Sequence, residues 1–290
     1  MLLSEAFELY RTDVILFKNQ SPKTEENHLV CLKALFVFFG DVPIESLAFS
    51  MVRDWKTALA KTRSDSTVRN YIIRLRVVLD FCNSRGVICL RAEQVPVPKR
   101  NDTVPEFITK EDVAKLIRAV SVPAPGYSRL NRLKNAAMIA LLYASGIRVS
   151  ELCGLNRADV KEDGTFTVVG KGGRARLCFM DERAAWLVNE YLVERSDNNT
   201  ALFISAQNTR RITPGTVQGV FRLARKKAGF TAPIHPHTLR HSFATNLLRN
   251  NANIRYVQVM LGHASLETTQ MYTHVIDEDL KAAYMRHHSI

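Results

Sequence analysis

Apolar residues recur at helical spacing through the first part of the chain. In segment 65–86 most of them fall on one helix face, at Val68, Tyr71, Ile72, Leu75, Val78, Leu79 and Phe81. Ser21 and Pro22 are typical of a helix start, and Gly40 is typical of a helix end. The pattern therefore predicts that residues 1–92 form a helical domain.

The helical pattern stops at residues 95–98, Val-Pro-Val-Pro, which are followed by a run of polar residues. Two prolines without periodic apolar positions predict an extended interdomain linker, which we place at residues 93–106. Thr109, with Asp112 three residues later, then predicts the start of a new helix. A second domain is expected over residues 107–290.

The second domain is predicted to be mostly helical with one short sheet. Two β-rich runs, residues 165–169 and 174–179, flank Gly170-Lys171-Gly172-Gly173, which is typical of a β-hairpin. Further helices are expected over residues 181–195, 213–227, 237–250 and 254–261. The predicted fold class is therefore mainly α with a small antiparallel β-sheet.

Basic residues outnumber acidic ones, with 40 Lys and Arg against 28 Asp and Glu and a formal charge of +12. This excess favours a polyanionic partner, with nucleic acid first and an anionic membrane surface second, while an ordinary basic enzyme is the plain alternative. Four basic residues lie on or near the polar helix faces of the first domain: Lys56, Arg69, Arg74 and Arg76. We interpret them as a DNA-binding surface that contacts phosphates; the alternative is a solvated helix face.

The five cysteines are scattered, odd in number and without a Cys-x-x-Cys pair, which is typical of a reduced cytosolic protein. The chain opens Met-Leu-Leu-Ser-Glu, without the basic and apolar regions of a leader peptide. Its longest apolar run, residues 136–144, is far too short to span a bilayer. We therefore expect a cytoplasmic protein that works without a membrane.

The candidate chemistry centres on Tyr272. An unperturbed tyrosine has a pKa of about 10, so a nucleophilic tyrosine needs positive neighbours near neutral pH. Attack on a phosphodiester also adds negative charge to the non-bridging oxygens in the transition state. Arginine suits that charge because its planar guanidinium donates two parallel hydrogen bonds and stays protonated. Arg148, two residues after Gly146, and Arg240, four residues after Pro236, are the candidates for this clamp.

Helical spacing adds one partner to each arginine. Glu151 lies three residues after Arg148, so it can share a helix face with Arg148 and orient it. His237 lies three residues before Arg240, so one helical turn presents both side chains to the same point. His237 is therefore the candidate that takes the proton of the tyrosine.

The remaining candidates are Lys171 and His263. Lys171, in the predicted hairpin turn, can give a proton to the leaving 5′-oxygen, and His263 can donate to a phosphate oxygen. The Gly-Lys-Gly-Gly sequence alone is a common turn and lacks the rest of a P-loop. His235, His237 and His241 resemble a metal cluster only superficially, because no acidic or cysteine ligand stands nearby, so no metal is expected.

The ordered series of these residues resembles the signature of the tyrosine recombinases, the integrase family of site-specific DNA recombinases. Two flanking words support the resemblance: Thr-Leu-Arg-His-Ser-Phe-Ala-Thr from residue 238, and Thr-Thr-Gln-Met-Tyr-Thr-His-Val from residue 268. The compact length and the ending Arg286-His287-His288 are similar to the Xer-type subgroup, and mobile-element integrases share the same compact core. No departure from the catalytic pattern is visible.

The resemblance implies that a core-binding domain, residues 1–92, and a catalytic tyrosine recombinase domain, residues 107–290, close around double-stranded DNA. It implies attack by Tyr272 on the scissile phosphate, a 3′-phosphotyrosyl bond and a Holliday junction, without a metal, ATP or any other cofactor. Four protomers would form a homotetramer on two paired DNA sites, and a partner recombinase or directionality factor can take part. The helix expected within residues 277–290 would pack into the neighbouring protomer.

Other functions stay open from sequence alone. A type IB topoisomerase uses a similar set of residues and only relaxes DNA. A non-cleaving DNA-binding architectural factor could keep the same fold, and a metal-dependent nuclease is the remotest choice. Within the recombinases, resolution of chromosome dimers and integration or excision of a mobile element are both compatible with these residues.

Overall fold

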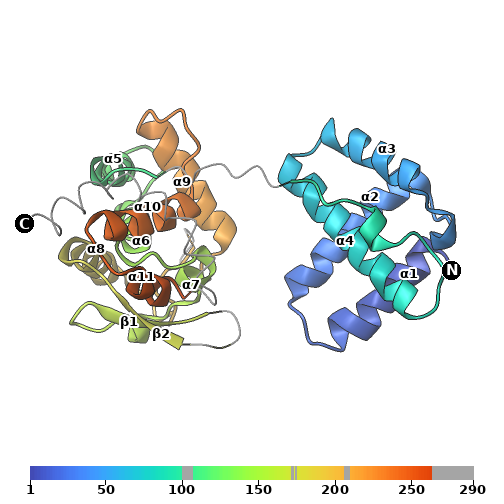
Figure 1. Cartoon of the computed structure of the whole chain (residues 1–290). Coiled ribbons are helices and arrows are strands. Elements are labelled where there is room, and N and C mark those ends of the chain that lie inside the picture. The colour runs from blue at the N-terminus through green and yellow to red at the C-terminus, as the bar shows by residue number, and fades with distance from the viewer. Residues whose placement is uncertain (100–106, 171–172, 174, 206–209, 263–290) are drawn as a thin grey trace, which may run out of the picture. The chain divides into compact units, whose positions relative to one another are not determined.

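The computed structural model places the chain in two compact units, Met1–Thr103 and Val104–Ile290 (Figure 1). The residues that it describes are 1–99, 107–170, 173, 175–205 and 210–262. Each unit encloses a hydrophobic cluster of its own, as expected of a separate domain.

The first unit is built from helices and short helical turns. Its elements are α1 (Leu3–Tyr10), a π-helical continuation (Arg11–Leu16), α2 (Pro22–Phe39), a 3-10 turn (Ile44–Ser46), α3 (Phe49–Ala60), α4 (Asp65–Ser84) and a 3-10 turn (Ala92–Gln94). The apolar face predicted for segment 65–86 is the buried face of α4, and it packs in one cluster with Trp55 of α3. Each large apolar side chain buried in this way contributes about 1.5–3 kcal/mol.

Local signals place the ends of α2 as the sequence predicts. Ser21 Oγ accepts a hydrogen bond from the backbone N–H of Thr24 at 3.2 Å, and Pro22 occupies the first helical position, where its missing N–H costs nothing. Gly40 ends the helix with φ +73°, a backbone conformation that side chains disfavour. The helix is therefore bounded by contacts between residues close in sequence.

Residues 92–98 pack on the first unit. Val95 is only 2% exposed and belongs to the same hydrophobic cluster as Trp55. Arg76 Nη1 donates to Val95 O at 2.9 Å, and Arg69 Nε donates to Pro98 O at 3.1 Å. The first part of the predicted linker is thus held against α4, while residues 100–106 lie outside the described residues. The domain boundaries of the sequence analysis remain predictions.

The second unit is mainly helical, with one hairpin. Its elements are α5 (Lys110–Ser121), α6 (Arg129–Ser145), α7 (Val149–Gly154), a 3-10 turn (Arg157–Asp159), β1 (Thr165–Val169), β2 (Ala175–Phe179), α8 (Glu182–Val193), α9 (Pro214–Lys227), α10 (Pro236–Arg249) and α11 (Ile254–Leu261). Helix α6 runs through the middle of this unit and packs against α5, α8 and α10 (Figure 1).

The apolar run at residues 136–144 belongs to α6. Residues 134–142 of this helix are all buried, which is typical of a helix enclosed by others on every side. Among the described residues no helix is both long and apolar enough to cross a membrane.

The predicted hairpin is present as two antiparallel strands, β1 and β2. Phe166 pairs with Cys178, and both side chains are buried on the inner face of the sheet. Residues 171, 172 and 174 of the connection lie outside the described part of the chain, so β2 is described from Ala175. The predicted fold class, mainly α with a small antiparallel sheet, is confirmed.

Candidate active site

Arg148 stands at the start of α7, immediately after the turn that ends α6. Gly146 ends α6 in the left-handed conformation, and Arg148 follows in extended backbone as the N-cap of α7. The backbone N–H of Arg148 donates to Glu151 Oε2 at 2.7 Å, and its Nη1 donates to Glu151 Oε1 at 2.9 Å. The Arg148 side chain remains 34% exposed. The two residues therefore meet, and the orienting role of Glu151 remains a prediction.

Arg240, a buried residue of α10, extends toward the same turn at Gly146. Its Nη1 donates to Gly146 O at 2.7 Å, and its Nη2 donates to Leu261 O at 2.6 Å. Arg148 Nη2 donates to the next carbonyl, Gly262 O, at 3.2 Å. Arg148 and Arg240, which we call the arginine clamp, are thus brought together at the C-terminal end of α11.

A third arginine at this place, Arg176, was missed by the sequence analysis. It lies on β2, where its Nη1 and Nη2 donate to the two carboxylate oxygens of Glu151 at 2.8 and 2.7 Å. Its Nε donates to Met260 O at 2.9 Å. A signal was available, because strand alternation places residue 176 on the same inner face as Cys178, and a charged side chain there needs a partner.

Glu151 is held ionised by these arginines. Burial of the carboxyl group by itself raises its pKa, but hydrogen bonds from Arg176 and from the Arg148 backbone and side chain outweigh that effect. The net result is a pKa of Glu151 below its ordinary value. Arg148 and Arg176 bind this carboxylate, and Arg240 binds the carbonyl of Leu261 at the same end of α11. Three guanidinium groups thus outnumber one carboxylate here, and the excess positive charge suits an anionic ligand.

His237 lies in the first turn of α10, three residues before Arg240, and is exposed. Desolvation by surrounding protein atoms, followed by the positive charges of His235, Arg240 and Arg148, lowers the pKa of His237. A histidine with a lowered pKa is mostly neutral near pH 7, so it can accept a proton. His237 and Arg240 lie one turn apart on α10, which places the imidazole beside the arginine clamp.

His235 and His241 have other surroundings. His235 caps α10, since its Nδ1 accepts from the backbone N–H of Thr238 at 3.3 Å. Desolvation and the neighbouring charges of His237 and Arg240 lower the pKa of His241 to about 4. Within the ranges that the structure describes, no three His, Cys, Asp or Glu side chains form a group that could hold a metal.

Three predicted site residues lie outside the described residues: Lys171, His263 and Tyr272. The helix expected within residues 277–290 lies outside them as well. The described chain ends at Gly262, whose carbonyl oxygen already contacts the arginine clamp, and His263 is the next residue in the sequence.

The four predicted DNA-binding residues of the first unit differ in their surroundings, and their role remains a prediction. Lys56 is exposed on α3, whereas Arg69 and Arg76 of α4 donate to the backbone of residues 95–98. Arg74 lies on a different face of α4, since each residue advances about 100° around a helix. The structure therefore separates Arg74 from Arg69 and Arg76.

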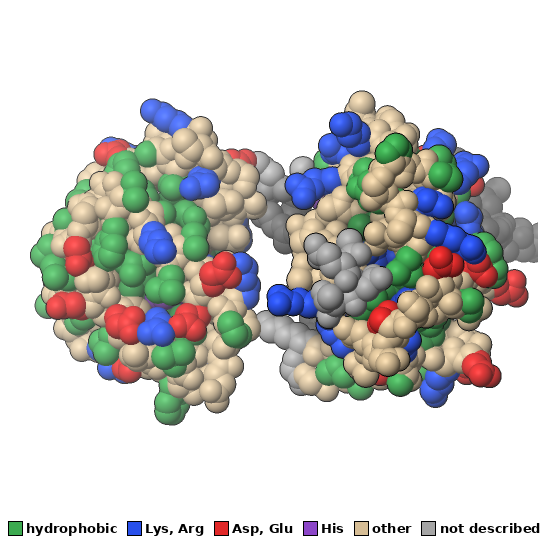
Figure 2. Space-filling view, turned by 180° about the vertical axis from the view of Figure 1, so that it is seen from behind, with side chains coloured by type: hydrophobic (Ala, Val, Ile, Leu, Met, Phe, Trp, Pro, Cys, Tyr) green, Lys and Arg blue, Asp and Glu red, His purple; other side chains and the backbone are tan. Residues whose placement is uncertain are grey.

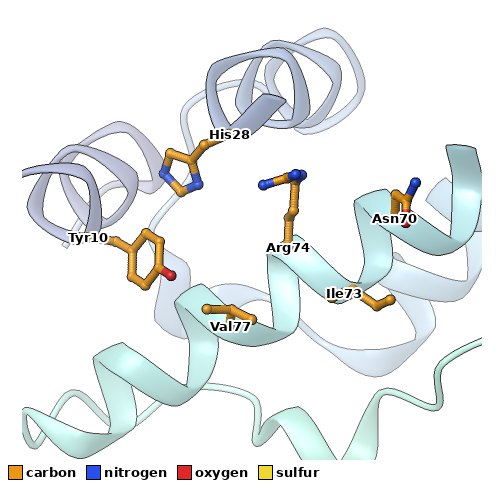
Figure 3. Close-up of a pocket in the computed structure, with 6 residues that line it drawn as sticks. All are labelled: Tyr10, His28, Asn70, Ile73, Arg74 and Val77. Carbon is orange, nitrogen blue, oxygen red and sulfur yellow. The ribbon is translucent and has the colours of Figure 1, made fainter. Parts of the chain in front are cut away.

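Arg74 lines a pocket of about 150 Å³ in the first unit. Figure 3 shows its guanidinium extending toward His28, with Tyr10 across the pocket and Asn70, Ile73 and Val77 along α4. The rings of Tyr10 and His28 lie 5.1 Å apart, and His28 Nε2 lies 3.1 Å from Phe7 O. The pocket thus combines a cation with aromatic and polar walls, and only Arg74 had been singled out from the sequence.

The sequence and the fold of this chain are similar to those of known proteins. Residues 106–279 match the phage integrase family, a span that includes the arginine clamp, His237 and Tyr272. The chain belongs to the phage integrase family. This membership confirms the predicted resemblance and the prediction of a tyrosine recombinase enzyme.

Relatives of this integrase-family chain include tyrosine recombinase XerC of Thermodesulfovibrio yellowstonii, 34% identical over 88% of this chain and 87% of the relative. Tyrosine recombinase XerA of Pyrococcus furiosus is 32% identical over 87% of this chain and 86% of that protein. Among solved structures, a Tn1549 transposon integrase in complex with transposon right end DNA has a TM-score of 0.81 at 18% identity, with full coverage of both chains. That likeness supports the fold alone.

In this integrase-family chain the turn that carries Arg148 depends on Gly146. An alanine Cβ at this position would overlap the ring of Phe243, and its φ of +63° disfavours any side chain. We expect Gly146→Ala to lower the free energy of unfolding by about 2–5 kcal/mol, from backbone strain and overpacking together. Gly154→Ala is the matched control, because nothing lies within 4 Å of its Cβ position. Equal denaturation midpoints for the two variants would contradict this expectation.

The histidines predict a loss of stability in mild acid. An unfolded histidine takes up a proton near pH 6.5, whereas folded His241 does so only near pH 4. The unfolded chain therefore binds more protons between these pH values, so the free energy of unfolding should fall as the pH drops from 6.5 toward 4. The lowered pKa values of His28 and His237 act in the same direction.

Denaturant titrations at pH 7 and pH 5 measure this loss, and His241→Gln should show a smaller one. The same loss in the variant and the wild type would show that His241 is not its source.

Proposed function

We propose that this chain is a site-specific DNA recombinase that cleaves and rejoins DNA through a covalent 3′-phosphotyrosyl bond to Tyr272. The observation that carries the proposal is the convergence of Arg148 and Arg240 at the end of α11, with His237 one helical turn before Arg240 on α10. In the sequence that end leads into the segment with Tyr272. Two guanidinium groups beside a proton-accepting imidazole suit the stabilisation of a phosphoryl transition state.

In the proposed reaction Tyr272 gives its proton to His237 and its oxygen attacks phosphorus. A tyrosine–phosphorus bond forms as the bond to the 5′-oxygen breaks, and Lys171 protonates that leaving oxygen. The arginine clamp neutralises the non-bridging oxygens, Glu151 orients Arg148, and His263 donates a further hydrogen bond. The free 5′-hydroxyl of the partner strand then attacks the phosphotyrosyl bond. The bond energy is kept throughout, so neither a metal nor ATP is needed.

DNA is the proposed partner of both units. On the face of the second unit seen in Figure 2, Lys and Arg side chains are more numerous than Asp and Glu side chains, in keeping with the net charge of +12. Residues 1–92 act as the core-binding domain and residues 107–290 as the catalytic domain. In the first domain Lys56, Arg69, Arg74 and Arg76 contribute phosphate contacts, with Arg74 as the principal one.

The proposed assembly is a tetramer on two paired duplexes, with the C-terminal segment of each protomer packed into its neighbour. The names of the relatives, XerC and XerA, support a Xer-like role, such as resolution of chromosome dimers in the cytoplasm. Integration or excision of a mobile element, with a partner recombinase or directionality factor, is the alternative.

Covalent capture tests the proposal. The full chain is incubated with fragmented host DNA in EDTA and denatured with SDS, and the DNA that stays attached to protein is sequenced. We expect one recurrent sequence. Two differently labelled copies of that duplex are then incubated with the chain, and recombination produces strands that carry both labels.

The outcomes separate the candidate functions. Strands that carry both labels support the recombinase. Relaxation of supercoiled plasmid without such strands would favour a topoisomerase, and DNA binding without a covalent product would favour an architectural factor. Capture that requires a divalent metal would contradict the proposed chemistry.

The pocket at Arg74 gives a prediction for DNA binding. An arginine that contacts a backbone phosphate releases counterions, so Arg74→Ala should weaken binding to all sequences and lower the slope of log K against log salt by about 1. Arg53→Ala is the control, because Arg53 is exposed on α3 and paired with Asp54. Filter binding at several salt concentrations measures both slopes. An unchanged slope for Arg74→Ala would show that Arg74 does not contact a DNA phosphate.

A further inference from the structure

We infer that Arg176 is a positioning residue, which holds Glu151 and the end of α11 in one fixed relation to Arg148. The inference rests on the proposed function, because it concerns how the arginine clamp is aligned for the reaction. The spacing of the candidate catalytic residues in the sequence does not predict a role in the reaction for Arg176 or for strand β2.

Arg176 is more deeply buried than Arg148 and is bonded to protein groups of the site. Its side chain is 10% exposed, against 34% for Arg148, so Arg148 is the more accessible to a phosphate. Each of the three guanidinium nitrogens of Arg176 donates to a protein acceptor, two of them to Glu151 and one to Met260 O. Since the side chain is mostly buried and each of its nitrogens is bonded to the protein, we place its effect on the substrate through those partners.

The first partner is Glu151, which is nearly fully buried. Arg176 binds both carboxylate oxygens, and the same oxygens accept from the Arg148 Nη1 and backbone N–H. The carboxylate thus has one orientation that satisfies all four donors. Arg148 inherits this orientation, since its guanidinium is bonded to the same carboxylate.

The second partner is the C-terminal end of α11. The last carbonyls of a helix have no partner within the helix and carry partial negative charge. Here Met260 O accepts from Arg176, Leu261 O from Arg240 and Gly262 O from Arg148. Three consecutive carbonyls are therefore matched by three arginines from β2, α10 and the start of α7.

Gly262 completes the contact with Arg176. Its φ is +64°, and a Cβ at this position would lie 3.0–3.2 Å from Arg176 Nη1, Cδ and Cζ. The absence of a side chain lets the guanidinium lie directly against the chain. Arg176 therefore fixes both the clamp and the point from which the chain continues toward His263 and Tyr272.

Arg176→Lys tests the inference, because lysine keeps the charge but has one nitrogen in place of three. The control is Arg195→Lys. Arg195 also binds both oxygens of a carboxylate, that of Asp197, and donates to the carbonyls of Ala201 and Leu202, but it has no described contact with the clamp. Both variants are assayed for thermal stability, DNA affinity and the rate of covalent complex formation on the duplex recovered by covalent capture.

We expect both variants to lose some stability. Only Arg176→Lys should slow covalent complex formation, by about 100-fold at saturating DNA, because a clamp displaced by about 1 Å loses that much. DNA affinity should change little. Hydrogen exchange of the amides in residues 254–262 should also rise in Arg176→Lys and stay unchanged in Arg195→Lys.

A double-variant cycle separates positioning from general stability. Because part of the effect of Arg176 passes through Arg148, Arg176→Lys should slow the reaction by a smaller factor in the Arg148→Ala background than in the wild type. Independent, multiplicative slowing would overturn the inference, and so would a wild-type rate for Arg176→Lys. A wild-type chain that forms no covalent complex would instead overturn the proposed function, and the inference with it.

Discussion

Replacing Tyr272 by phenylalanine is expected to abolish covalent attachment of the chain to DNA and to leave DNA binding intact. The change removes only the phenolic oxygen, which the proposal makes the nucleophile. The positive charge that attracts the backbone phosphates is untouched, because it comes from lysines and arginines. SDS-resistant protein–DNA complexes on the captured duplex measure the first property, and a gel-shift titration measures the second.

Tyr256→Phe is the matched control for this experiment. Tyr256 is an exposed tyrosine on α11, within the same unit, and the proposal gives it no role in the reaction. It should retain attachment at the wild-type rate. Attachment that survives in Tyr272→Phe would mean that another side chain is the nucleophile, and the proposed mechanism would fall.

Arg148→Ala is expected to slow covalent attachment by about 1,000-fold, the lower end of the range for a lost transition-state arginine. The fold should tolerate the change, because Glu151 keeps both of its hydrogen bonds from Arg176 and is not left as an unpaired buried charge. Binding to DNA should weaken only modestly, since one charge of many is lost. Single-turnover rates at saturating DNA, alongside thermal unfolding, separate the two effects.

Arg183→Ala serves as the comparison, because Arg183 is an exposed arginine on α8 outside the cluster. It removes the same charge without touching Glu151 or α11. A rate loss in Arg183→Ala as large as in Arg148→Ala would mean that overall charge, and not the clamp, governs the reaction.

The local elements followed from the sequence because their signals act over a few residues. Ser21 and Gly40 bound α2, Thr109 caps α5 through Asp112, and Gly262 ends α11. Each of these contacts spans at most four residues, so it is visible in the sequence itself. The meeting of Arg148 with Glu151 has the same origin, since helical spacing alone brings them together.

The predicted DNA-binding residues of α4 differ in ways that their sequence does not indicate. Arg69, Arg74 and Arg76 are alike in the sequence, all basic and all in one helix. Their surroundings differ because residues 95–98 return to α4 and take hydrogen bonds from Arg69 and Arg76. Helical spacing does not tell which side of a helix a later segment will cover.

By itself the sequence determined the mainly helical fold class and the family of the chain, and it supplied the candidate residues for the proposed chemistry. Cap residues, apolar spacing and ordered motifs are properties of short stretches, and they can be read without knowing the fold. Only the tertiary structure decided that Arg148, Arg176 and Arg240 meet at the carbonyls of α11. Those contacts join residues 21 to 114 positions apart, so they exist only after helices, hairpin and core have packed together.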